Sequence, residues 1–403
     1  MALKKFKLKI FLKAVVFITA VSLCLVGCSA RFASPDEQER ESDTKDSLSC
    51  FIPSISANPT DVSVSAHSAI LIEMDSGEIV YAKNADERLP MASTTKIMTA
   101  LVALENCDVS RTVTVSPQAV GIEGSSVYLF AGEKITMQDL LYALLLSSAN
   151  DAAAAIAIEV GGSIEGFAQM MNDRARELGL ENTNFTNPHG LYDEQHYTTA
   201  RELALIANEA MKHPAFAKIV ATYKWASKMA DSDETRLFVN HNKLLKSYEG
   251  TCGIKTGFTK KSGRCLVSCA ERDGTRLLCV TLNAPDDWRD HSALFDYGYS
   301  IYTTLTLCEA GELEYSLPLV GGEQDCVELT NTARVSVTLP RGVTPECEIQ
   351  LPRFVYADVN DGQILGYAVY KLDGREIARV PLASKYKVSR KIYKKGILGA
   401  LFG

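Results

Sequence analysis

The sequence has no metal-binding motif of a familiar kind. It contains eleven cysteines and six histidines, but no Cys-x-x-Cys pair and no His-Glu-x-x-His segment occurs in its 403 residues. Zinc sites depend on such closely spaced ligands. The sequence therefore gives no support to a metal centre, and we expect a protein that works without a cofactor.

The chain also lacks an excess of basic residues. Lysine and arginine total 42 against 49 aspartate and glutamate residues, which gives a formal net charge of −7. A nucleic-acid-binding protein needs positive charge to neutralise phosphates. We therefore expect no nucleic-acid partner. A length of 403 residues exceeds the usual size of one domain and favours two.

The apolar run near the N-terminus is short for a membrane-spanning helix. The run AVVFITAVSLCLVG follows five lysines and has the proportions of a signal peptide. It ends in the string LVGC, which resembles the lipobox of bacterial lipoproteins. We predict a lipoprotein-type signal peptide at residues 1–28 with lipid on Cys28, and ordinary cleavage after Ala30 is the alternative. Either reading places the mature protein outside the cytoplasm. We expect it to be secreted and associated with the outer face of the membrane.

Composition divides the rest of the chain into four parts. Residues 29–60 include SPDEQERESDTKDS and are predicted to form a flexible charged linker. Helical and hairpin patterns fill residues 61–306, and short alternating segments at 307–384 predict a small β-sandwich-like domain. Residues 385–403 form a basic, partly apolar tail that we expect to lie on an anionic membrane surface. A frayed basic end is the alternative.

Turn and capping signals outline the first of these domains. Turn residues at 75–78 and at 273–274 predict two β-hairpins. A capping box that begins at Thr136 predicts a helix, and Asn150 or Asp151 is expected to cap the next one. Helices among hairpins predict an α+β fold, with an antiparallel sheet packed against a helical cluster.

The cysteines do not form an evident disulfide framework. Three of them occur among leucine and valine in candidate strands: Cys265, Cys269 and Cys279. Free cysteine packs there as a small hydrophobic residue. Cys252 is either redox-sensitive or a packing residue, and packing is favoured. Cys326 and Cys347 could form a disulfide, which the sequence leaves open.

The string Ser93-Thr94-Thr95-Lys96 opens a strongly apolar segment. Residues three apart share one face of a helix, so Lys96 is expected beside the Ser93 hydroxyl. Burial disfavours the charged form of a lysine and lowers its pKa, which would make Lys96 a base for Ser93. The alternative is an exposed lysine near the start of a helix.

Two later motifs make the catalytic interpretation stronger. Ser148-Ala149-Asn150 interrupts an apolar stretch, and Lys255-Thr256-Gly257 precedes the second predicted hairpin. Serine-x-x-lysine, serine-x-asparagine and lysine-threonine-glycine, in this order, occur in penicillin-binding proteins and in class A β-lactamases.

Longer segments resemble one family in particular. The strings AILIEMDSGEIVYAKNADERLPMASTTKIMTALVALE, GEKITMQDLLYALLLSSANDAAAAIA, NFTNPHGLYDEQHYTTARELALIA and GIKTGFTKKSGRCLVSCA are similar to the low-molecular-weight penicillin-binding proteins, the serine-type D-alanyl-D-alanine carboxypeptidases. The resemblance covers residues 63–302. It implies a β-lactamase/transpeptidase-like domain that removes the terminal D-alanine from peptidoglycan stem peptides. It also implies covalent inhibition by β-lactam antibiotics.

The resemblance assigns a role to each motif residue. Ser93 is the nucleophile, Lys96 accepts its proton, and Ser148 relays a proton to the leaving amine. The remaining positions are expected to bind the substrate. The Asn150 amide would bond to the substrate backbone or to Lys96, and Lys255 and Thr256 would bind the free carboxylate of the substrate. Gly257 would let the strand approach the substrate closely, and Phe258 would contribute its backbone N–H. The N–H groups of Ser93 and Phe258 would form the oxyanion hole.

Two other functions are compatible with the motifs. A class A-like β-lactamase would share the fold and nucleophile, but the sequence shows no recognisable loop with the glutamate that such enzymes use for deacylation. A non-catalytic penicillin-binding lipoprotein would keep the cleft without turnover, although the intact set of three motifs argues against it. Transfer of the acyl group to another amine, in place of water, is also open.

Overall fold

The computed structural model describes residues 62–229 and 234–392. The predicted signal peptide, Cys28 and the linker at 29–60 lie outside these residues. The helices are the 3₁₀ turns η1 (Ala92–Thr95) and η2 (Pro117–Ala119), and α3 (Lys96–Asn106), α4 (Met137–Leu146), α5 (Asn150–Gly161), α6 (Ile164–Glu177), α7 (Ala200–Met211), α8 (Pro214–Ala221), α9 (Leu244–Ser247) and α10 (Asp287–Ile301).

The strands are β1 (Ser68–Glu73), β2 (Ile79–Lys83), β3 (Thr112–Thr114), β4 (Lys134–Thr136), β5 (Lys224–Lys228), β6 (Thr235–Val239), β7 (Thr251–Thr259), β8 (Gly263–Arg272), β9 (Thr275–Leu282), β10 (Tyr302–Cys308), β11 (Glu314–Val320), β12 (Cys326–Thr330), β13 (Val335–Pro340), β14 (Glu346–Gln350), β15 (Val355–Tyr356), β16 (Ile364–Leu372) and β17 (Arg375–Ser384). We call residues 62–301 the helix–sheet domain and residues 302–392 the β domain.

The helix–sheet domain is built on a five-stranded sheet in the order β2-β1-β9-β8-β7. All neighbouring strands in it are antiparallel. The two predicted hairpins are present: β1 turns into β2 after Glu73, and β8 turns into β9 at Asp273-Gly274. Both turn residues have positive φ values of 49° and 80°, a conformation that glycine adopts without strain.

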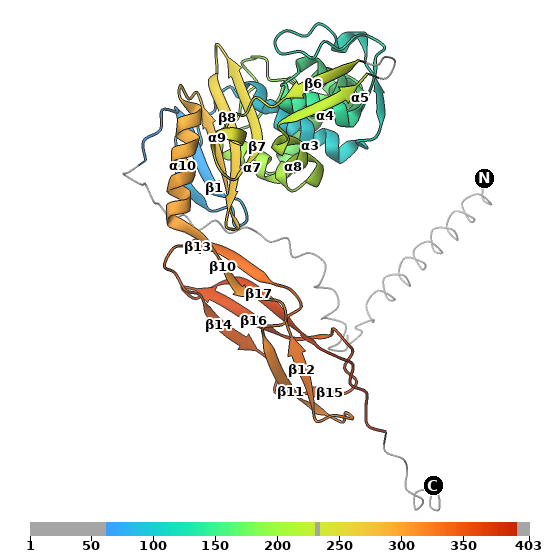
Figure 1. The fold of residues 1–403 in the computed structure, drawn as a ribbon, viewed down its shortest axis with the longest axis vertical. Helices are drawn as coiled ribbons and strands as arrows, with labels where there is room; N and C mark the ends of the chain where they lie inside the picture. Colours follow the sequence, from blue (N-terminus) through green and yellow to red (C-terminus); the bar gives the residue numbers. More distant parts are fainter. Residues whose placement is uncertain (1–61, 230–233, 393–403) are drawn as a thin grey trace, which may run out of the picture. The chain divides into compact units, whose positions relative to one another are not determined.

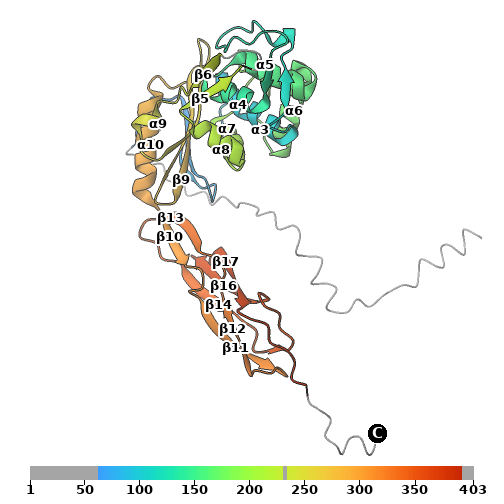
Figure 2. The same cartoon turned by 45° about the vertical axis from the view of Figure 1, so that its right-hand side comes forward.

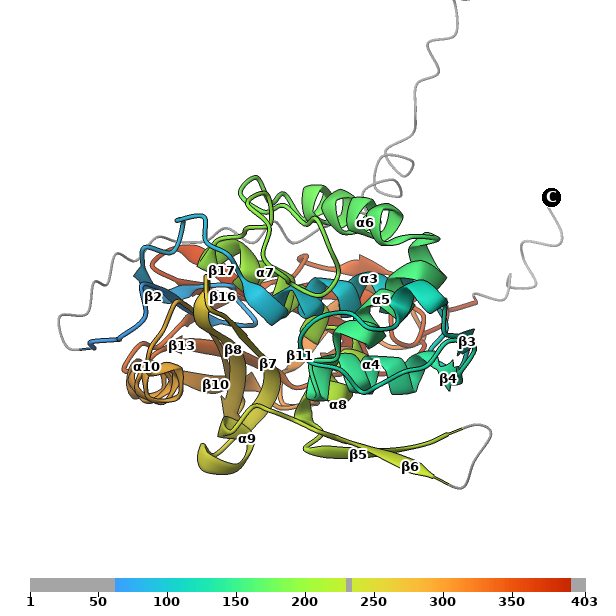
Figure 3. The ribbon, with the colours of Figure 1, turned by 90° about the horizontal axis from the view of Figure 1, so that it is seen from above.

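A helical cluster covers one face of this sheet. Figure 1 shows α3, α4, α5 and α8 on the side of the sheet opposite α10, and Figure 3 shows the same division from above. The cluster and the facing side chains form one hydrophobic core, in which Ile97 and Leu101 of α3 are 0% exposed. Truncating a leucine in such a core costs about 2–5 kcal/mol of folding stability. Helix α3 is therefore held firmly against its neighbours.

Capping agrees with the sequence at one helix and differs at the next. Thr136 caps α4, because its hydroxyl accepts a hydrogen bond from the backbone N–H of Asp139. Helix α5 begins at Asn150, and its N-cap residue is Ala149, which has no capping side chain. The prediction that Asn150 or Asp151 caps this helix is wrong. The Asn150 side chain bonds to Lys96 and Glu123, and the Asp151 carboxylate accepts hydrogen bonds from residues 126, 127 and 129 of the preceding loop.

The opposite face of the sheet packs against α10. Leu294 and Phe295 of this helix are fully buried in a second core with Leu71 and Leu277 of the sheet. The two covered faces explain why consecutive residues are buried in both strands, from Cys265 to Ala270 in β8 and from Leu277 to Leu282 in β9. The sheet is thus the middle layer of the helix–sheet domain.

The β domain contains strands only, as the alternating pattern after residue 307 predicts (Figure 2). Strands β10 and β13 form a two-stranded sheet, and the others form a six-stranded sheet in the order β14-β16-β17-β12-β11-β15. The boundary predicted after Thr306 falls inside β10, which already pairs with β13 from Tyr302 onward.

The first residues of the predicted membrane tail belong to the β domain. Val388 is 2% exposed and exchanges backbone hydrogen bonds with Val359. The Lys385 ammonium pairs with Glu314. The prediction that the tail begins at residue 385 is therefore too early, and residues 393–403 lie outside the described part of the chain.

Two further observations concern the described residues alone. No helix among them is long and apolar enough to span a membrane. Cys326 and Cys347, the pair left open by the sequence, are both exposed free thiols.

Candidate active site

Ser93 lies in the 3₁₀ turn that leads directly into α3. The preceding residue, Ala92, has a φ of 48°, which is uncommon for a residue with a side chain. A Cβ on Gly190 would lie 1.9 Å from the Ala92 carbonyl oxygen, so a neighbouring loop holds this turn tightly. Such backbone strain persists only where the surroundings impose it, and it is common at functional sites.

Lys96 follows one turn later, and its side chain is 0% exposed. Its Nζ lies 3.0 Å from Ser93 Oγ, 2.7 Å from Asn150 Oδ1 and 2.6 Å from the His189 carbonyl oxygen. A neutral amine has two N–H donors and one lone pair. Donation to Asn150 and His189 would leave the lone pair of Lys96 facing the Ser93 hydroxyl.

The surroundings of Lys96 favour this neutral form. Burial lowers its pKa well below the usual lysine value, and the nearby Lys255 ammonium lowers it further. The Asp151 carboxylate acts in the opposite direction with a smaller effect. A lowered pKa increases the neutral fraction of Lys96, and the neutral amine is the form that can accept a proton as a general base.

The loop that contacts Lys96 is held by a buried histidine. His196 Nδ1 accepts a hydrogen bond from the backbone N–H of Thr186, and its Nε2 lies 2.8 Å from Thr95 Oγ1. Burial lowers the pKa of His196 to about 4, so the ring stays neutral. This arrangement fastens the loop that carries His189 and Gly190 to the turn that carries Ser93.

The second motif meets the first at Lys96. Ser148 has a φ of 58° and is 5% exposed, in the link between α4 and α5. Asn150 donates from its amide to the Glu123 carbonyl oxygen at 2.5 Å and accepts from Lys96. The Asn150 side chain therefore connects Lys96 to the loop before β4.

The third motif lies on β7, at the edge of the sheet. A Cβ on Gly257 would lie 3.1 Å from the Ser93 backbone nitrogen, so a larger residue would push the strand away from the nucleophile. Lys255 is 1% exposed, and its Nζ donates to the Thr256 carbonyl oxygen. Burial lowers the pKa of Lys255 to about 7. Phe258 is 65% exposed.

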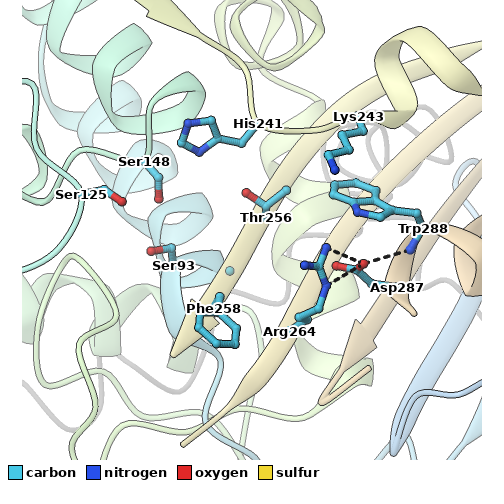
Figure 4. A pocket seen from close by; sticks show the side chains of 11 residues that line it. Ser93, Ser125, Ser148, His241, Lys243, Thr256, Phe258, Arg264, Asp287 and Trp288 are labelled. Atoms are coloured by element: carbon cyan, nitrogen blue, oxygen red, sulfur yellow. Dashed lines mark hydrogen bonds and ion pairs between the residues drawn. The ribbon is translucent and has the colours of Figure 1, made fainter. Parts of the chain in front are cut away.

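A cleft of about 350 Å³ connects these motifs. Its lining residues are Ser93, Ser125, Ser148, His241, Lys243, Thr256, Gly257, Phe258, Arg264, Asp287 and Trp288. Figure 4 shows the three serines on one side, Thr256 in the middle, and Arg264, Asp287 and Trp288 on the other.

The far side of the cleft holds a fixed cation that the sequence analysis missed. The Arg264 guanidinium pairs with the buried Asp287 carboxylate, with Nη2 2.8 Å from Oδ1. It also lies over the Trp288 ring at 5.6 Å. Only the strand register, which pairs Arg264 with Phe258, brings this arginine to the cleft. The backbone carbonyl of His189 was missed for a similar reason, because no sequence signal marks a loop carbonyl.

The arrangement of the three motifs agrees with the comparisons with known proteins. The family model described as D-alanyl-D-alanine carboxypeptidase matches residues 54–286, which is more than half of the chain. The chain belongs to the D-alanyl-D-alanine carboxypeptidase family. A second model, the C-terminal domain of penicillin-binding protein 5, matches residues 302–390 in the β domain.

Individual relatives support the same assignment over most of the length. D-alanyl-D-alanine carboxypeptidase DacF of Bacillus subtilis is 34% identical, in an alignment that covers 84% of this chain and 89% of DacF. DacC of Escherichia coli is 33% identical, covering 79% and 83% of the two chains. These matches confirm the predicted family and the predicted enzyme class, a serine-type D-alanyl-D-alanine carboxypeptidase.

Solved structures agree with the fold. Penicillin-binding protein 5 from Haemophilus influenzae matches with a TM-score of 0.62 and 28% identity, covering 82% of this chain and 99% of that one. The Streptomyces K15 DD-transpeptidase matches with a TM-score of 0.58 and 33% identity, covering 60% and 100%. The predicted fold class is confirmed: a mixed helix and sheet domain followed by a β domain.

Proposed function

We propose that this D-alanyl-D-alanine carboxypeptidase removes the terminal D-alanine from peptidoglycan pentapeptide stems through an acyl-enzyme on Ser93. One observation carries the proposal. Lys96 is buried, has a strongly lowered pKa, and places its Nζ 3.0 Å from the Ser93 hydroxyl. A nucleophile and a neutral base in contact are what serine-based acyl transfer requires.

Acylation begins when Lys96 takes the Ser93 proton and Ser93 Oγ attacks the carbonyl carbon of the penultimate D-alanine. Negative charge then develops on the carbonyl oxygen. The backbone N–H groups of Ser93 and Phe258 would stabilise that charge, since Gly257 keeps β7 close to the Ser93 nitrogen. Removing one donor of such a hole typically slows a reaction by about 10²–10³-fold.

Collapse of this intermediate needs a proton for the departing D-alanine amine. Ser148 lines the cleft beside Ser93, so its hydroxyl is placed to pass a proton from Lys96 to that amine. Asn150 accepts a hydrogen bond from Lys96 and so keeps the Lys96 amine in position. We assign Asn150 a positioning role in preference to a substrate contact. The C–N bond breaks, D-alanine leaves, and water hydrolyses the ester.

The substrate carboxylate would be bound by Thr256 and Arg264. Thr256 lines the cleft, whereas the Lys255 ammonium is buried and bonded to the Thr256 carbonyl. Arginine stays protonated at all relevant pH values and can bind a carboxylate through two N–H groups. This modifies the role predicted for Lys255, which instead lowers the pKa of Lys96 across the site.

The β-lactamase alternative lacks a structural basis in the cleft. None of the cleft-lining residues, all of which belong to the described part of the chain, is a glutamate. Asp287, the acidic residue that lines the cleft, is engaged by Arg264. We infer that β-lactams acylate Ser93 and leave slowly. Transfer to an acceptor amine is a second possible fate of the acyl-enzyme, favoured by the 33% identity to a protein named as a DD-transpeptidase.

We further propose that the enzyme works outside the cytoplasm, at the membrane surface. The sequence support is the signal-like N-terminus with Cys28 and the basic, apolar run at its C-terminal end. A lipid chain together with a basic patch gives stable anchoring, whereas one weak signal alone does not. Deleting residues 393–403 in a Cys28→Ala background should release the protein into the soluble fraction after a salt wash. Full retention in the membrane fraction would contradict this scheme.

The activity itself is tested with a peptide that ends in D-Ala-D-Ala. Purified full-length protein should release free D-alanine and should be labelled covalently by fluorescent penicillin. Rapid hydrolysis of penicillin with little D-alanine release would favour the β-lactamase alternative. Labelling without any D-alanine release would favour a non-catalytic penicillin-binding protein.

A further inference from the structure

Two cysteines that the proposed acyl transfer does not use face each other on β7 and β8. Strand β7 contains a bulge: Thr251 pairs with Ala270 and Gly253 pairs with Cys269, which leaves Cys252 as the extra residue. In such a bulge two residues of one strand oppose a single residue of the other. Cys252 therefore lies beside Cys269, and both belong to the core between the sheet and the helical cluster.

The bulge brings the two side chains together, with Cys252 opposite Cys269. Hydrogen bonding from the Cys269 side chain lowers the pKa of the Cys252 thiol. Cys269 is 0% exposed, and burial raises its pKa. Cys252 is only partly buried, so solvent reaches one member of the pair. The reachable thiol is thus also the one that ionises more easily.

The other cysteines of the same sheet differ in both respects. Cys265 and Cys279 are 0% exposed, and burial raises the pKa of each thiol. The thiolate is the reactive form of cysteine, and redox-sensitive cysteines are accessible, have a lowered pKa and lie next to a second thiol. Among the described cysteines of this sheet, Cys252 with Cys269 meets these conditions.

We propose that Cys252 and Cys269 form a redox-sensitive pair that closes into a disulfide across β7 and β8 on exposure to hydrogen peroxide. Directly paired residues of neighbouring antiparallel strands have Cα atoms about 4.5–5.5 Å apart, and a disulfide spans about 4.4–6.8 Å between Cα atoms. Cys252 is the neighbour of Gly253, the residue that pairs with Cys269, and the bulge places both Cys252 and Gly253 opposite Cys269.

The chemistry takes two steps. The Cys252 thiolate attacks one oxygen of hydrogen peroxide, the O–O bond breaks, and hydroxide leaves, which produces a sulfenic acid on Cys252. The Cys269 sulfur then attacks the sulfenic sulfur, the S–S bond forms, and the sulfenic oxygen leaves as hydroxide. With the protons of the two thiols, both hydroxides become water. Two thiols are oxidised and one peroxide is reduced.

Peptide mapping tests the pair directly in the full-length protein. The protein is treated with a small excess of hydrogen peroxide, denatured in the presence of the alkylating reagent so that buried free thiols are also blocked, and digested with trypsin without reduction. Cleavage gives Ser247–Lys255, which contains Cys252, and Cys265–Arg272, which contains Cys269. We expect these two peptides to appear as one linked species that has lost two hydrogen atoms and that dithiothreitol separates.

Cys265 shares the second peptide and provides the matched control. Cys265→Ala should keep the linked species, whereas Cys269→Ala should lose it and leave Cys252 as a sulfenic acid that reacts with dimedone. If Cys269→Ala does not fold, fragmentation of the wild-type linked peptide between Cys265 and Cys269 assigns the bond instead.

Two results would contradict the proposal that Cys252 and Cys269 form a redox-sensitive pair. One is full alkylation of Cys252 and Cys269 under peroxide that oxidises the exposed Cys326. The other is oxidation of Cys252 to sulfinic acid without a link to Cys269. Because the assay measures the state of the thiols and not D-alanine release, its outcome does not depend on the proposed activity.

Discussion

The helix–sheet domain and the β domain treat charged side chains in opposite ways. In the helix–sheet domain Lys96, Lys255 and Asp151 are at most 1% exposed. Among the described residues of the β domain, the buried polar side chains are Asn331 and Ser384, both neutral. Burying a charge is costly unless its partners compensate. The first domain therefore accepts this cost, at Lys96 for its chemistry, while the described part of the second domain avoids it.

Two lysines make the comparison concrete. The Lys385 ammonium of the β domain is 29% exposed and meets a carboxylate, which raises its pKa. Lys96 is fully buried near another lysine, and its pKa falls. The same residue type is an ordinary surface cation in one domain and a base in the other.

Among the variants that test this comparison, replacement of the nucleophile should cause the largest loss of activity. Ser93→Ala removes the hydroxyl that forms the acyl-enzyme but leaves the core around α3 intact. We expect complete loss of penicillin labelling and of D-alanine release, with a thermal unfolding midpoint near the wild-type value. Labelling that persists in Ser93→Ala would place the nucleophile elsewhere.

Lys96→Arg should reduce activity almost as much while keeping the positive charge. Arginine does not release its proton, so it cannot accept one from Ser93. We expect kcat to fall by about 10²–10⁴-fold, the range that a positioned general base contributes. Residual activity above about a tenth of wild type, measured by D-alanine release, would indicate another base.

The sequence predicted the parts of this site that depend on local geometry. Ser93 and Lys96 are three residues apart on one helical face, and Thr136 caps its helix through a contact three residues away. The sequence could not predict the hydrogen bond between Lys96 and the His189 carbonyl oxygen, because His189 lies in a loop 93 residues further along the chain.

Long-range contacts also explain the wrong predictions. Asn150 does not cap α5, because its amide is used by Lys96 and Glu123. Lys255 was expected to reach the substrate, but strand packing buries it, and Arg264 from the next strand lies in the cleft instead. Each difference arises from tertiary packing that a local pattern does not contain.

Arg264→Gln should have an intermediate effect, confined to substrates with a free carboxylate. A hydrogen bond to a charged group is worth about 1.5–3 kcal/mol, which corresponds to a loss of about 10- to 150-fold in kcat/KM. An amidated peptide should show a much smaller difference between variant and wild type. Arg272→Gln on the same strand, outside the cleft, is the matched control. Equal losses with both peptides would contradict a carboxylate-binding role.

Lys255→Met should change the pH dependence more than the maximum rate. Lys255 titrates at about 7, so below that pH it is protonated and lowers the pKa of Lys96. The neutral form of Lys96 is the active base, so activity rises as pH increases through its pKa. Without the Lys255 charge this pKa rises, and the acidic limb of the kcat/KM profile should move to higher pH. Lys134→Met, at an exposed position on β4, should leave the profile unchanged.

Lys385→Ala should have the smallest effect of all. Its ammonium lies 2.5 Å from Glu314, whose side chain is 66% exposed. Exposed ion pairs contribute little, because water and salt screen the charges and two long side chains lose freedom. We expect kcat/KM, penicillin labelling and the thermal unfolding midpoint to match wild type within experimental scatter. A measurable loss of activity would mean that the β domain contributes to catalysis. Charged side chains would then have a functional role in both domains, which contradicts the comparison made above.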